Sequence, residues 1–327
     1  MSTLDALKRC TRITADTGDA EEMRRWKPEE ATTNPTLILN LFQSSECEAT
    51  LDEAYELAHA GFTKSKKEPT LDAVCQACLV ITAKQILKVI PGRVSIEVDA
   101  RMSSDTKVTT KAALDLVKLC GAASVDTKRI LIKIAATWEG IRAAETLEKK
   151  GIACNGTLIF HEVQALACAQ ANVTLISPFV GRIYDWYVAH GLWNEGDADP
   201  GVQSVQRIFS LLKSQGYKTE IMGASFRNTG EILALAGCDR LTIAPKFLEQ
   251  LARMDEPIKA QLKAPKSVEK SPPITEAEFR EQLSKSEMAT EKLNAGVRLF
   301  SQDCRGLSEL IMSYLDVTDR PYLRQEL

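Results

Sequence analysis

Eight short runs rich in apolar and β-branched residues alternate along the chain with longer stretches of helical periodicity. The expected strands are residues 11–15, 31–33, 94–98, 130–135, 154–160, 174–180, 219–224 and 240–244. This alternation is typical of parallel strands covered by helices, and eight is the number of strands in a closed (β/α)8 TIM barrel. No Gly-x-Gly-x-x-Gly pattern follows the first run, which disfavours an open, doubly wound sheet. We therefore expect an α/β fold built on one barrel.

Local signals mark the ends of several expected helices. Thr275 and Glu278 match a capping box and predict the start of a helix. Four glycines follow helical stretches and suit the left-handed position after a helix, namely Gly121, Gly151, Gly216 and Gly237. We expect one catalytic domain over residues 1–327, in which 257–273 crosses the surface and 275–327 forms a helical tail packed on the barrel.

Composition narrows the class of protein. The net charge of −3 and the lack of a long apolar run argue against a nucleic acid or membrane partner. The first residues lack a signal peptide's charged start and apolar core, which predicts a cytoplasmic protein with reduced thiols. Cys75 and Cys78 lie on an apolar helical face and are expected to be structural. The three histidines, His59, His161 and His190, are dispersed, so we expect neither a metal nor another cofactor.

Lys133 lies inside the apolar run 130–136. Burial disfavours the charged form of a lysine, and a neutral amine is the nucleophile that forms a Schiff base with a carbonyl. The alternative is a lysine that points to solvent from an edge strand. This segment alone favours neither interpretation.

Polar residues lie at or just after the carboxyl ends of the expected strands, where barrel enzymes carry their chemistry. They are Asp16, Thr33, Asn34, Glu97, Asp99, Lys133, Asn155, Thr157 and Ser177. Individually, Asp16 and Asn34 could form turns, and Glu97 could face solvent. Together they supply the amine, the proton carriers and the hydrogen-bonding groups that a Schiff-base enzyme acting on a polyol requires.

Two arginines follow the sixth and seventh expected strands. Arg227 precedes Asn228, which is expected to cap a helix with Glu231 as its reciprocal partner. An arginine beside a helix N-terminus suits a phosphate. We expect Arg182 and Arg227 to hold one, although a surface arginine is an equal alternative for Arg227.

Six segments together resemble the transaldolase family. They are Ala15-Asp16-Thr17-Gly18-Asp19, Ala31-Thr32-Thr33-Asn34-Pro35-Thr36-Leu37, Glu97-Val98-Asp99-Ala100-Arg101, Ile132-Lys133-Ile134, Ile176-Ser177-Pro178-Phe179-Val180-Gly181-Arg182 and Gly223-Ala224-Ser225-Phe226-Arg227-Asn228. The region around Ala100 and the tail resemble the larger subfamily, whose members are homodimers.

The resemblance implies a metal-free transfer of dihydroxyacetone from sedoheptulose 7-phosphate to glyceraldehyde 3-phosphate, yielding erythrose 4-phosphate and fructose 6-phosphate in the pentose phosphate shunt. By motif position, Lys133 would form the Schiff base, Glu97 would act through a water aided by Thr157, and Asp16 would carry the proton at the cleaved bond. The resemblance also implies substrate contacts from Asn34, Asn155, Ser177, Phe179, Arg182, Ser225 and Arg227.

The sequence departs from the family pattern at Ser104, Ala136, Gly156 and His161, none of which has an expected role. Gly156 could loosen its strand and affect the rate. His161 is expected to start a helix.

The nearest alternative activity is an aldolase that releases dihydroxyacetone. Related aldolases place tyrosine where this chain has Phe179, which favours transfer because phenylalanine has no hydroxyl to position water. A phosphate-binding barrel without catalysis is the third alternative, and the intact Asp16, Glu97 and Lys133 argue against it.

Overall fold

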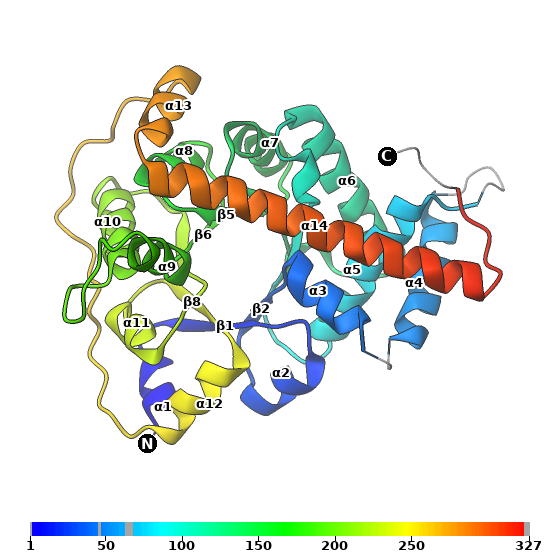
Figure 1. Ribbon diagram of the computed structural model, residues 1–327, viewed down its shortest axis with the longest axis horizontal. Helices are drawn as coiled ribbons and strands as arrows, with labels where there is room; N and C mark the ends of the chain where they lie inside the picture. Colours follow the sequence, from blue (N-terminus) through cyan, green and yellow to red (C-terminus); the bar gives the residue numbers. More distant parts are fainter. Residues whose placement is uncertain (1, 45–46, 63–67, 324–327) are drawn as a thin grey trace.

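The computed structural model describes residues 2–44, 47–62 and 68–323, so the last four residues of the expected tail lie outside it. Eight parallel strands form a closed barrel in chain order, and β8 pairs with β1 to complete it (Figure 1). The strands are β1 (Arg12–Asp16), β2 (Glu30–Thr32), β3 (Val94–Glu97), β4 (Ile130–Ala135), β5 (Cys154–Ile159), β6 (Leu175–Pro178), β7 (Glu220–Gly223) and β8 (Arg240–Ile243). The predicted TIM barrel is confirmed.

The predicted strands agree with the structure to within one or two residues at each end. The run 130–135 matches β4 without change. The run 174–180 extends beyond both ends of β6, because Phe179 makes only an isolated bridge to Ala224. Strand ends are the hardest feature to predict, since the chain turns into a loop while its side chains remain apolar.

Helices lie between successive strands and cover the outside of the barrel. The α-helices are α1 (Thr3–Leu7), α2 (Ala20–Trp26), α3 (Pro35–Phe42), α4 (Glu48–Phe62), α5 (Leu71–Leu87), α6 (Thr106–Ala122), α7 (Trp138–Glu148), α8 (Glu162–Gln170), α9 (Gly181–Ala189), α10 (Pro200–Ser214), α11 (Thr229–Ala234), α12 (Pro245–Arg253), α13 (Glu276–Ser284) and α14 (Glu287–Val317). Two 3₁₀ turns are η1 (Ala100–Met102) and η2 (Thr127–Arg129).

The helix ends predicted from Thr275 and from the four glycines are confirmed with one exception. Thr275 and Glu278 form both bonds of a capping box at the start of α13. Gly151, Gly216 and Gly237 have positive φ values of 76°, 68° and 96°. Gly121 does not fit this prediction: it lies inside α6, which continues to Ala122. The left-handed residue that follows α6 is Ser124, with φ 58°.

The C-terminal tail packs on the barrel, as predicted. α14 runs past the carboxyl ends of the strands and contacts α3, α5, α9, η1 and β5 (Figure 1). Its buried face includes Phe300, Leu307 and Ile311. Gly296 permits this close approach, because a Cβ atom there would come within 2.7 Å of the Leu158 side chain. The tail can therefore contribute residues to the mouth of the barrel.

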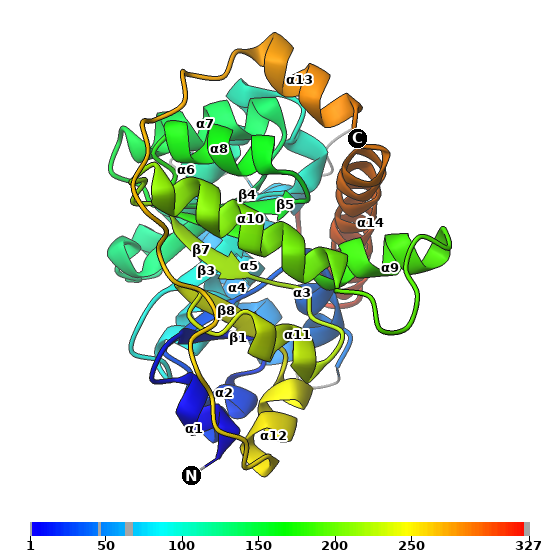
Figure 2. The same ribbon diagram turned by 90° about the vertical axis from the view of Figure 1, so that its left-hand side faces the viewer.

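Residues 254–275 connect α12 to α13 without regular secondary structure and run along the outside of the molecule (Figure 2). Val268 N donates to Ser214 O at 2.9 Å, and Gln261 N donates to Ala236 O at 2.7 Å. Within the described residues, no helix has the length and apolar character needed to cross a membrane.

Candidate active site

A cavity of about 230 Å³ lies at the carboxyl ends of the strands. Nine of the eleven predicted site residues line it: Asp16, Asn34, Lys133, Thr157, Ser177, Phe179, Arg182, Ser225 and Arg227. The other two, Glu97 and Asn155, contact lining residues from behind. Parallel strands end at one edge of the barrel, so residues far apart in the sequence meet here.

Lys133 lies on β4, in register with Glu97 of β3 and Asn155 of β5. Its Nζ atom is 2.8 Å from Glu97 Oε2 and donates to Thr33 O at 3.0 Å. Only 6% of its side chain is exposed. A closed barrel has no edge strand, so the interpretation of Lys133 as a solvent-facing edge lysine is wrong. The amine instead projects into the mouth of the barrel, where a carbonyl compound could reach it.

Glu97 is buried, and desolvation raises its pKa against the opposing effect of the Lys133 charge. Neither carboxylate oxygen has a hydrogen bond of good geometry to the described protein atoms, although Oε2 faces the ammonium group. The hydroxyl of Thr157 is also buried without a protein partner in the described chain. Glu97 Oε1 and the Thr157 hydroxyl can therefore bind water or a substrate hydroxyl without giving up a bond to the protein.

Asp16 ends β1 and accepts a hydrogen bond from Thr32 Oγ1 at 3.1 Å. Thr32 is in turn 2.7 Å from the Thr242 hydroxyl, so one side of the carboxylate is held in place. Desolvation raises the pKa of Asp16, while Lys133 and Thr32 oppose the shift. Burial therefore raises the pKa of both Asp16 and Glu97, a shift that is typical of carboxyl groups that take up and release a proton during a reaction.

Three residues with amide or hydroxyl groups surround the lysine. Ser177 Oγ donates to Asn155 Oδ1 at 2.7 Å, and the Asn155 amide donates to Ser95 Oγ at 3.1 Å. Asn155 is fully buried and lies behind the cavity wall. Asn34 accepts from Leu37 N at 3.0 Å and so caps α3, while it also lines the cavity. Asn34 thus begins a helix and does not form an isolated turn, and its place in the cavity wall is compatible with the substrate contact that the resemblance implies.

The two predicted phosphate arginines lie at the outer part of the cavity. The guanidinium of Arg182 lies between the rings of Phe179 and Phe300, 5.0 and 5.3 Å from their centroids. Desolvation and the nearby Arg227 charge lower the pKa of Arg182. Arg227 pairs with Asp185 at 2.6 Å through Nη2, while Nη1 lies 3.4 Å from Ser225 Oγ. Two guanidinium groups that share one cavity attract an anion with several oxygen atoms, such as a phosphate.

The predicted reciprocal cap of α11 is only half formed. Asn228 accepts from Glu231 N as expected, but Glu231 Oε2 accepts from Arg227 N at 2.7 Å, not from Asn228 N. The carboxylate thus reaches one residue further back along the chain. Burial, reinforced by nearby Asp199, raises the pKa of Glu231 to about 7. Glu231 therefore holds the backbone of the arginine loop.

A family model and several known proteins match nearly the whole of this chain. The family model described as Transaldolase/Fructose-6-phosphate aldolase matches residues 13–311. A transaldolase of Actinobacillus pleuropneumoniae serotype 3 (strain JL03) is 48% identical over 317 residues, which is 96% of this chain and 100% of the relative. A transaldolase of Prochlorococcus marinus (strain MIT 9211) is 50% identical over 307 residues, 92% of this chain and 90% of the relative.

The chain belongs to the transaldolase/fructose-6-phosphate aldolase family. It is an enzyme of the transaldolase type, a transferase, and the resemblance found in its motifs is confirmed.

The sequence motifs did not identify every residue of this transaldolase-type cavity. Lys246 from α12 and Phe300 from α14 also line it, as do Thr32 and Thr242. The two threonines lie at inward positions of β2 and β8, so strand alternation could have identified them. Phe300 carries no comparable signal, because only the packing of α14 brings it to the barrel mouth.

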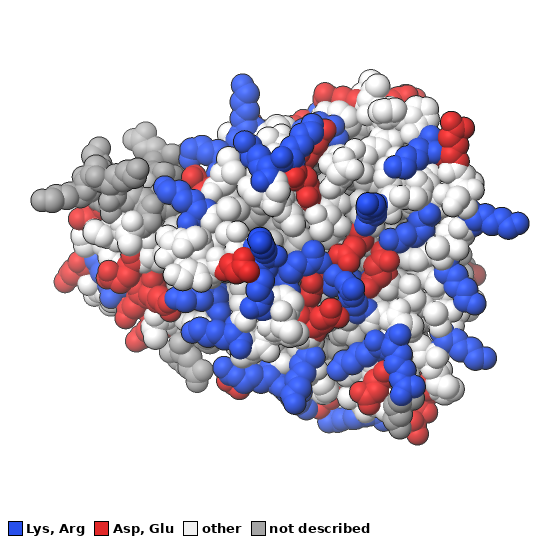
Figure 3. Space-filling view, turned by 180° about the vertical axis from the view of Figure 1, so that it is seen from behind, with Lys and Arg blue, Asp and Glu red and all other residues white. Residues whose placement is uncertain are grey.

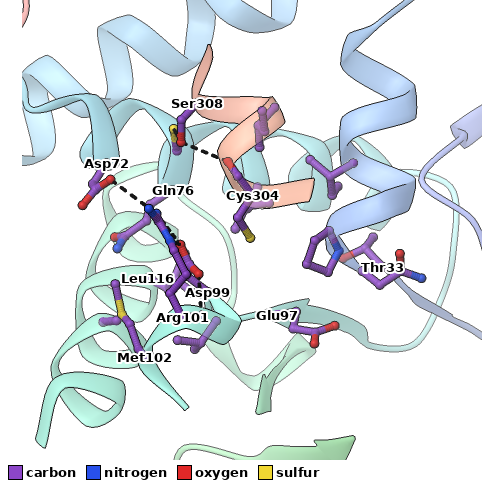
Figure 4. A pocket seen from close by; sticks show the side chains of 18 residues that line it. Thr33, Asp72, Gln76, Glu97, Asp99, Arg101, Met102, Leu116, Cys304 and Ser308 are labelled. Atoms are coloured by element: carbon purple, nitrogen blue, oxygen red, sulfur yellow. Dashed lines mark hydrogen bonds and ion pairs between the residues drawn. The ribbon is translucent and has the colours of Figure 1, made fainter. Parts of the chain in front are cut away.

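A second, smaller cavity of about 50 Å³ lies behind Glu97, between α5, α14 and η1 (Figure 4). The charged residues of its wall are Asp72, Glu97, Asp99 and Arg101. Arg101 pairs with Asp99 at 2.6 Å and with Asp72 at 4.0 Å. Much of the remaining wall is apolar, including Leu79, Leu116 and Leu307. The cavity is too small for a sugar phosphate, and its arginine already pairs with carboxylates.

The structure shows the surroundings of two of the four unusual family positions, His161 and Gly156. His161 caps α8, where its Nδ1 atom accepts from Val163 N at 3.0 Å. β5 continues through Gly156, and a Cβ atom there would come within 3.1 Å of Cys168 Sγ. The effect of Gly156 on the rate stays a prediction.

All nine cysteines are free thiols, as predicted. In the described part of the chain, no three His, Cys, Asp or Glu residues form a group that could hold a metal ion.

Proposed function

We propose that this enzyme transfers dihydroxyacetone from sedoheptulose 7-phosphate to glyceraldehyde 3-phosphate through a Schiff base on Lys133. The products would be erythrose 4-phosphate and fructose 6-phosphate, a reaction of the non-oxidative pentose phosphate pathway. The observation that carries the proposal is the 2.8 Å contact of buried Lys133 Nζ with Glu97, at a cavity that also contains Asp16 and two arginines.

The first step forms a carbon–nitrogen bond. Lys133 first passes a proton to Glu97, and its neutral amine then attacks the C2 carbonyl of the donor to form a carbinolamine. Glu97 then delivers this proton to the departing hydroxyl through a water that Thr157 also binds, so that water leaves and the Schiff base keeps a proton on its nitrogen. The raised pKa of Glu97 supports this role, because burial makes its carboxylate a better proton acceptor.

The second step breaks the bond between C3 and C4. Asp16 takes the proton of the C4 hydroxyl, the bonding electrons move into the Schiff base, and the aldehyde product leaves an enamine on Lys133. The enamine then attacks the acceptor aldehyde, and Asp16 returns the proton to the new hydroxyl oxygen. Hydrolysis of the second Schiff base releases the product and restores the lysine.

The remaining residues bind the sugar phosphate. Asn34 and Ser177 line the cavity and have polar groups for substrate hydroxyls. Asn155 acts through Ser177, to which it is hydrogen bonded at 2.7 Å. Arg182, Arg227 and Ser225 bind the phosphate with charge-assisted and hydroxyl hydrogen bonds.

Phe179 favours transfer over release of free dihydroxyacetone. Its ring lies against Phe160 at 5.4 Å and under the Arg182 guanidinium, so this wall of the cavity has no hydroxyl. Exclusion of a proton source keeps the enamine available for the acceptor aldehyde. Phe179→Tyr should raise release of dihydroxyacetone from fructose 6-phosphate and lower transfer to erythrose 4-phosphate. An unchanged ratio of the two rates would remove this reason for preferring a transferase to an aldolase.

The Schiff base is tested by trapping. Borohydride added with fructose 6-phosphate should inactivate the enzyme and add the mass of the reduced three-carbon adduct to the peptide that contains Lys133. Lys133→Met is the matched control and should gain no such mass. An adduct on another lysine, or none on the wild type, would refute the mechanism and would favour a barrel that binds phosphate without catalysis.

Three further expectations remain open to experiment. Prolonged chelation should leave activity intact, because the proposed steps use only side chains of this chain. Loss on chelation with recovery on adding a divalent ion would contradict that. Sedimentation should show a homodimer, and fractionation of the source cells should show cytoplasmic enzyme.

A further inference from the structure

Lys246 supplies a fourth cationic side chain to the proposed active-site cavity. It follows β8 in the first turn of α12 and lines the cavity together with Lys133, Arg182 and Arg227. Phosphate sites of such barrels form at the loops after the seventh and eighth strands. Ser225 and Arg227 follow β7, so Lys246 provides the corresponding position after β8.

The charge of Lys246 is not neutralised by a carboxylate. Among the described residues, no Asp or Glu oxygen forms an ion pair with its Nζ atom, which lies 4.6 Å from the centroid of the adjacent Phe247 ring. Arg227, by contrast, directs Nε and Nη2 toward Asp185. Arg182 is confined between two aromatic rings. Lys246 is therefore an exposed cation of the cavity without a carboxylate partner among the described residues, while both arginines are held in place.

The start of α12 adds to the positive potential at this position. Its N-cap residue is Ala244, which has no side-chain acceptor, and Pro245 follows it. The backbone N–H of Lys246 thus belongs to a helix end that no side chain caps, and such ends attract negative charge. This contribution is secondary to the lysine side chain.

The two donor sugars of the proposed reaction place their phosphates at different distances from Lys133. The reacting carbonyl is at C2 in both, but the phosphate is on C7 of sedoheptulose 7-phosphate and on C6 of fructose 6-phosphate. One additional carbon–carbon bond moves the phosphate outward by roughly 1.5 Å. A rigid pair of arginines cannot fit both positions equally well, whereas a lysine on a four-carbon stem can adjust.

We propose that Lys246 is a specificity-determining residue that binds the phosphate of the seven-carbon donor and contributes less to the six-carbon donor. The inference rests on the proposed sugar-phosphate transfer and identifies how the same cavity accepts two chain lengths. Arg182 and Arg227 bind the phosphate of either donor. Lys246 also binds the phosphate of the seven-carbon donor, which lies further from Lys133.

The test compares both donors in Lys246→Met, which keeps much of the side-chain length and removes the charge. KM for sedoheptulose 7-phosphate, with glyceraldehyde 3-phosphate as acceptor, should rise on the order of tenfold. KM for fructose 6-phosphate, with erythrose 4-phosphate as acceptor, should rise less than about threefold. Lys246→Arg should restore most of the discrimination, because it restores the charge. Lys263→Met, in the exposed connection outside the cavity, is the matched control and should change neither KM.

Equal rises for both donors would show that Lys246 is a general phosphate contact without selectivity, and no change for either would show that it contacts no phosphate. Each result would overturn the inference while leaving the transfer reaction intact. A wild-type enzyme inactive with both donors would instead refute the proposed function.

Discussion

Buried charged side chains are paired more completely at the amino-end mouth of the barrel than at the carboxyl-end mouth. At the amino ends of the strands, Arg240 is buried and pairs with Glu30 at 2.6 Å and with Glu220 at 3.0 Å. Arg93 pairs with the same two carboxylates at 2.8 Å each. At the carboxyl ends, Glu97 faces Lys133 through Oε2, while its buried Oε1 atom has no hydrogen bond or ion pair to the described residues.

The face opposite α14 has intermingled basic and acidic side chains near its centre (Figure 3). Charges that neutralise one another hold the strands together, and they leave little capacity for a ligand. Groups whose protein partners are incomplete can bind a ligand, and they contribute less to stability. We therefore expect substitutions at the amino-end mouth to affect folding and substitutions at the carboxyl-end mouth to affect catalysis.

The largest effect is expected for Lys133→Met. Without the nucleophile no Schiff base forms, and activity should fall on the order of 10⁴-fold or more. A coupled assay of sugar-phosphate transfer measures the rate, and circular dichroism should still show a cooperative unfolding transition. Substantial residual activity would contradict the assigned role of Lys133.

Arg240→Met tests the opposite mouth. It leaves Glu30 and Glu220 without one arginine in a buried network, which should lower the free energy of unfolding by about 3–5 kcal/mol. Activity of the folded enzyme at 25 °C should remain within about twofold of wild type, since the change is at the other end of the barrel. Urea titration and the transfer assay measure the two quantities.

The control for this variant is Arg25→Met, which breaks an exposed pair with Glu249 and should cost less than about 1 kcal/mol. If Arg240→Met lost activity at unchanged stability, the amino-end mouth would contribute to catalysis and the proposed difference between the two mouths would be wrong.

Arg227→Ala tests whether a charged residue at the carboxyl-end mouth binds the substrate phosphate. Loss of a charge-assisted bond, worth about 1.5–3 kcal/mol, should raise KM for phosphorylated substrates roughly 10–100-fold. The effect on an unphosphorylated analogue should be much smaller. Equal losses on both substrates would show that Arg227 and its pair with Asp185 are structural.

The smallest effect concerns the pH dependence of stability through Glu231. Its pKa is about 7 in the folded protein and has an ordinary value of 4.5 when exposed, so the folded state retains a proton that the unfolded state releases between these pH values. The resulting stabilisation is fully present below about pH 4.5 and is lost as the pH rises through about 7.

Glu231→Gln cannot titrate, so the difference in unfolding free energy between wild type and variant should fall by about 2 kcal/mol from pH 5 to pH 8. Urea titrations of both proteins at a series of pH values measure it. The subtraction removes the contribution of other buried carboxyls, including Asp16 and Glu97, whose pKa values are also raised. A difference independent of pH would show that Glu231 is already ionised at pH 5.

Much of the carboxyl-end mouth was predictable because its residues occur in local patterns. Glu97 and Lys133 each lie in a short β-branched run, and strand ends of a barrel converge at one edge. The capping pair of Thr275 and Glu278 was predictable for the same reason, since it spans one helical turn. Gly121 misled the prediction, because a glycine near a helix end does not show whether the helix stops there or continues.

The sequence by itself determined the alternation of strands and helices, the number of strands and the apolar setting of Lys133, since periodicity and composition act over a few residues. Only the tertiary structure decided that Lys133 lies 2.8 Å from Glu97, that α14 brings Phe300 over the cavity, and that Arg240 pairs with two carboxylates. Those contacts join residues far apart in the chain. They follow from the closure and register of the barrel and from the packing of its tail, which no local pattern specifies.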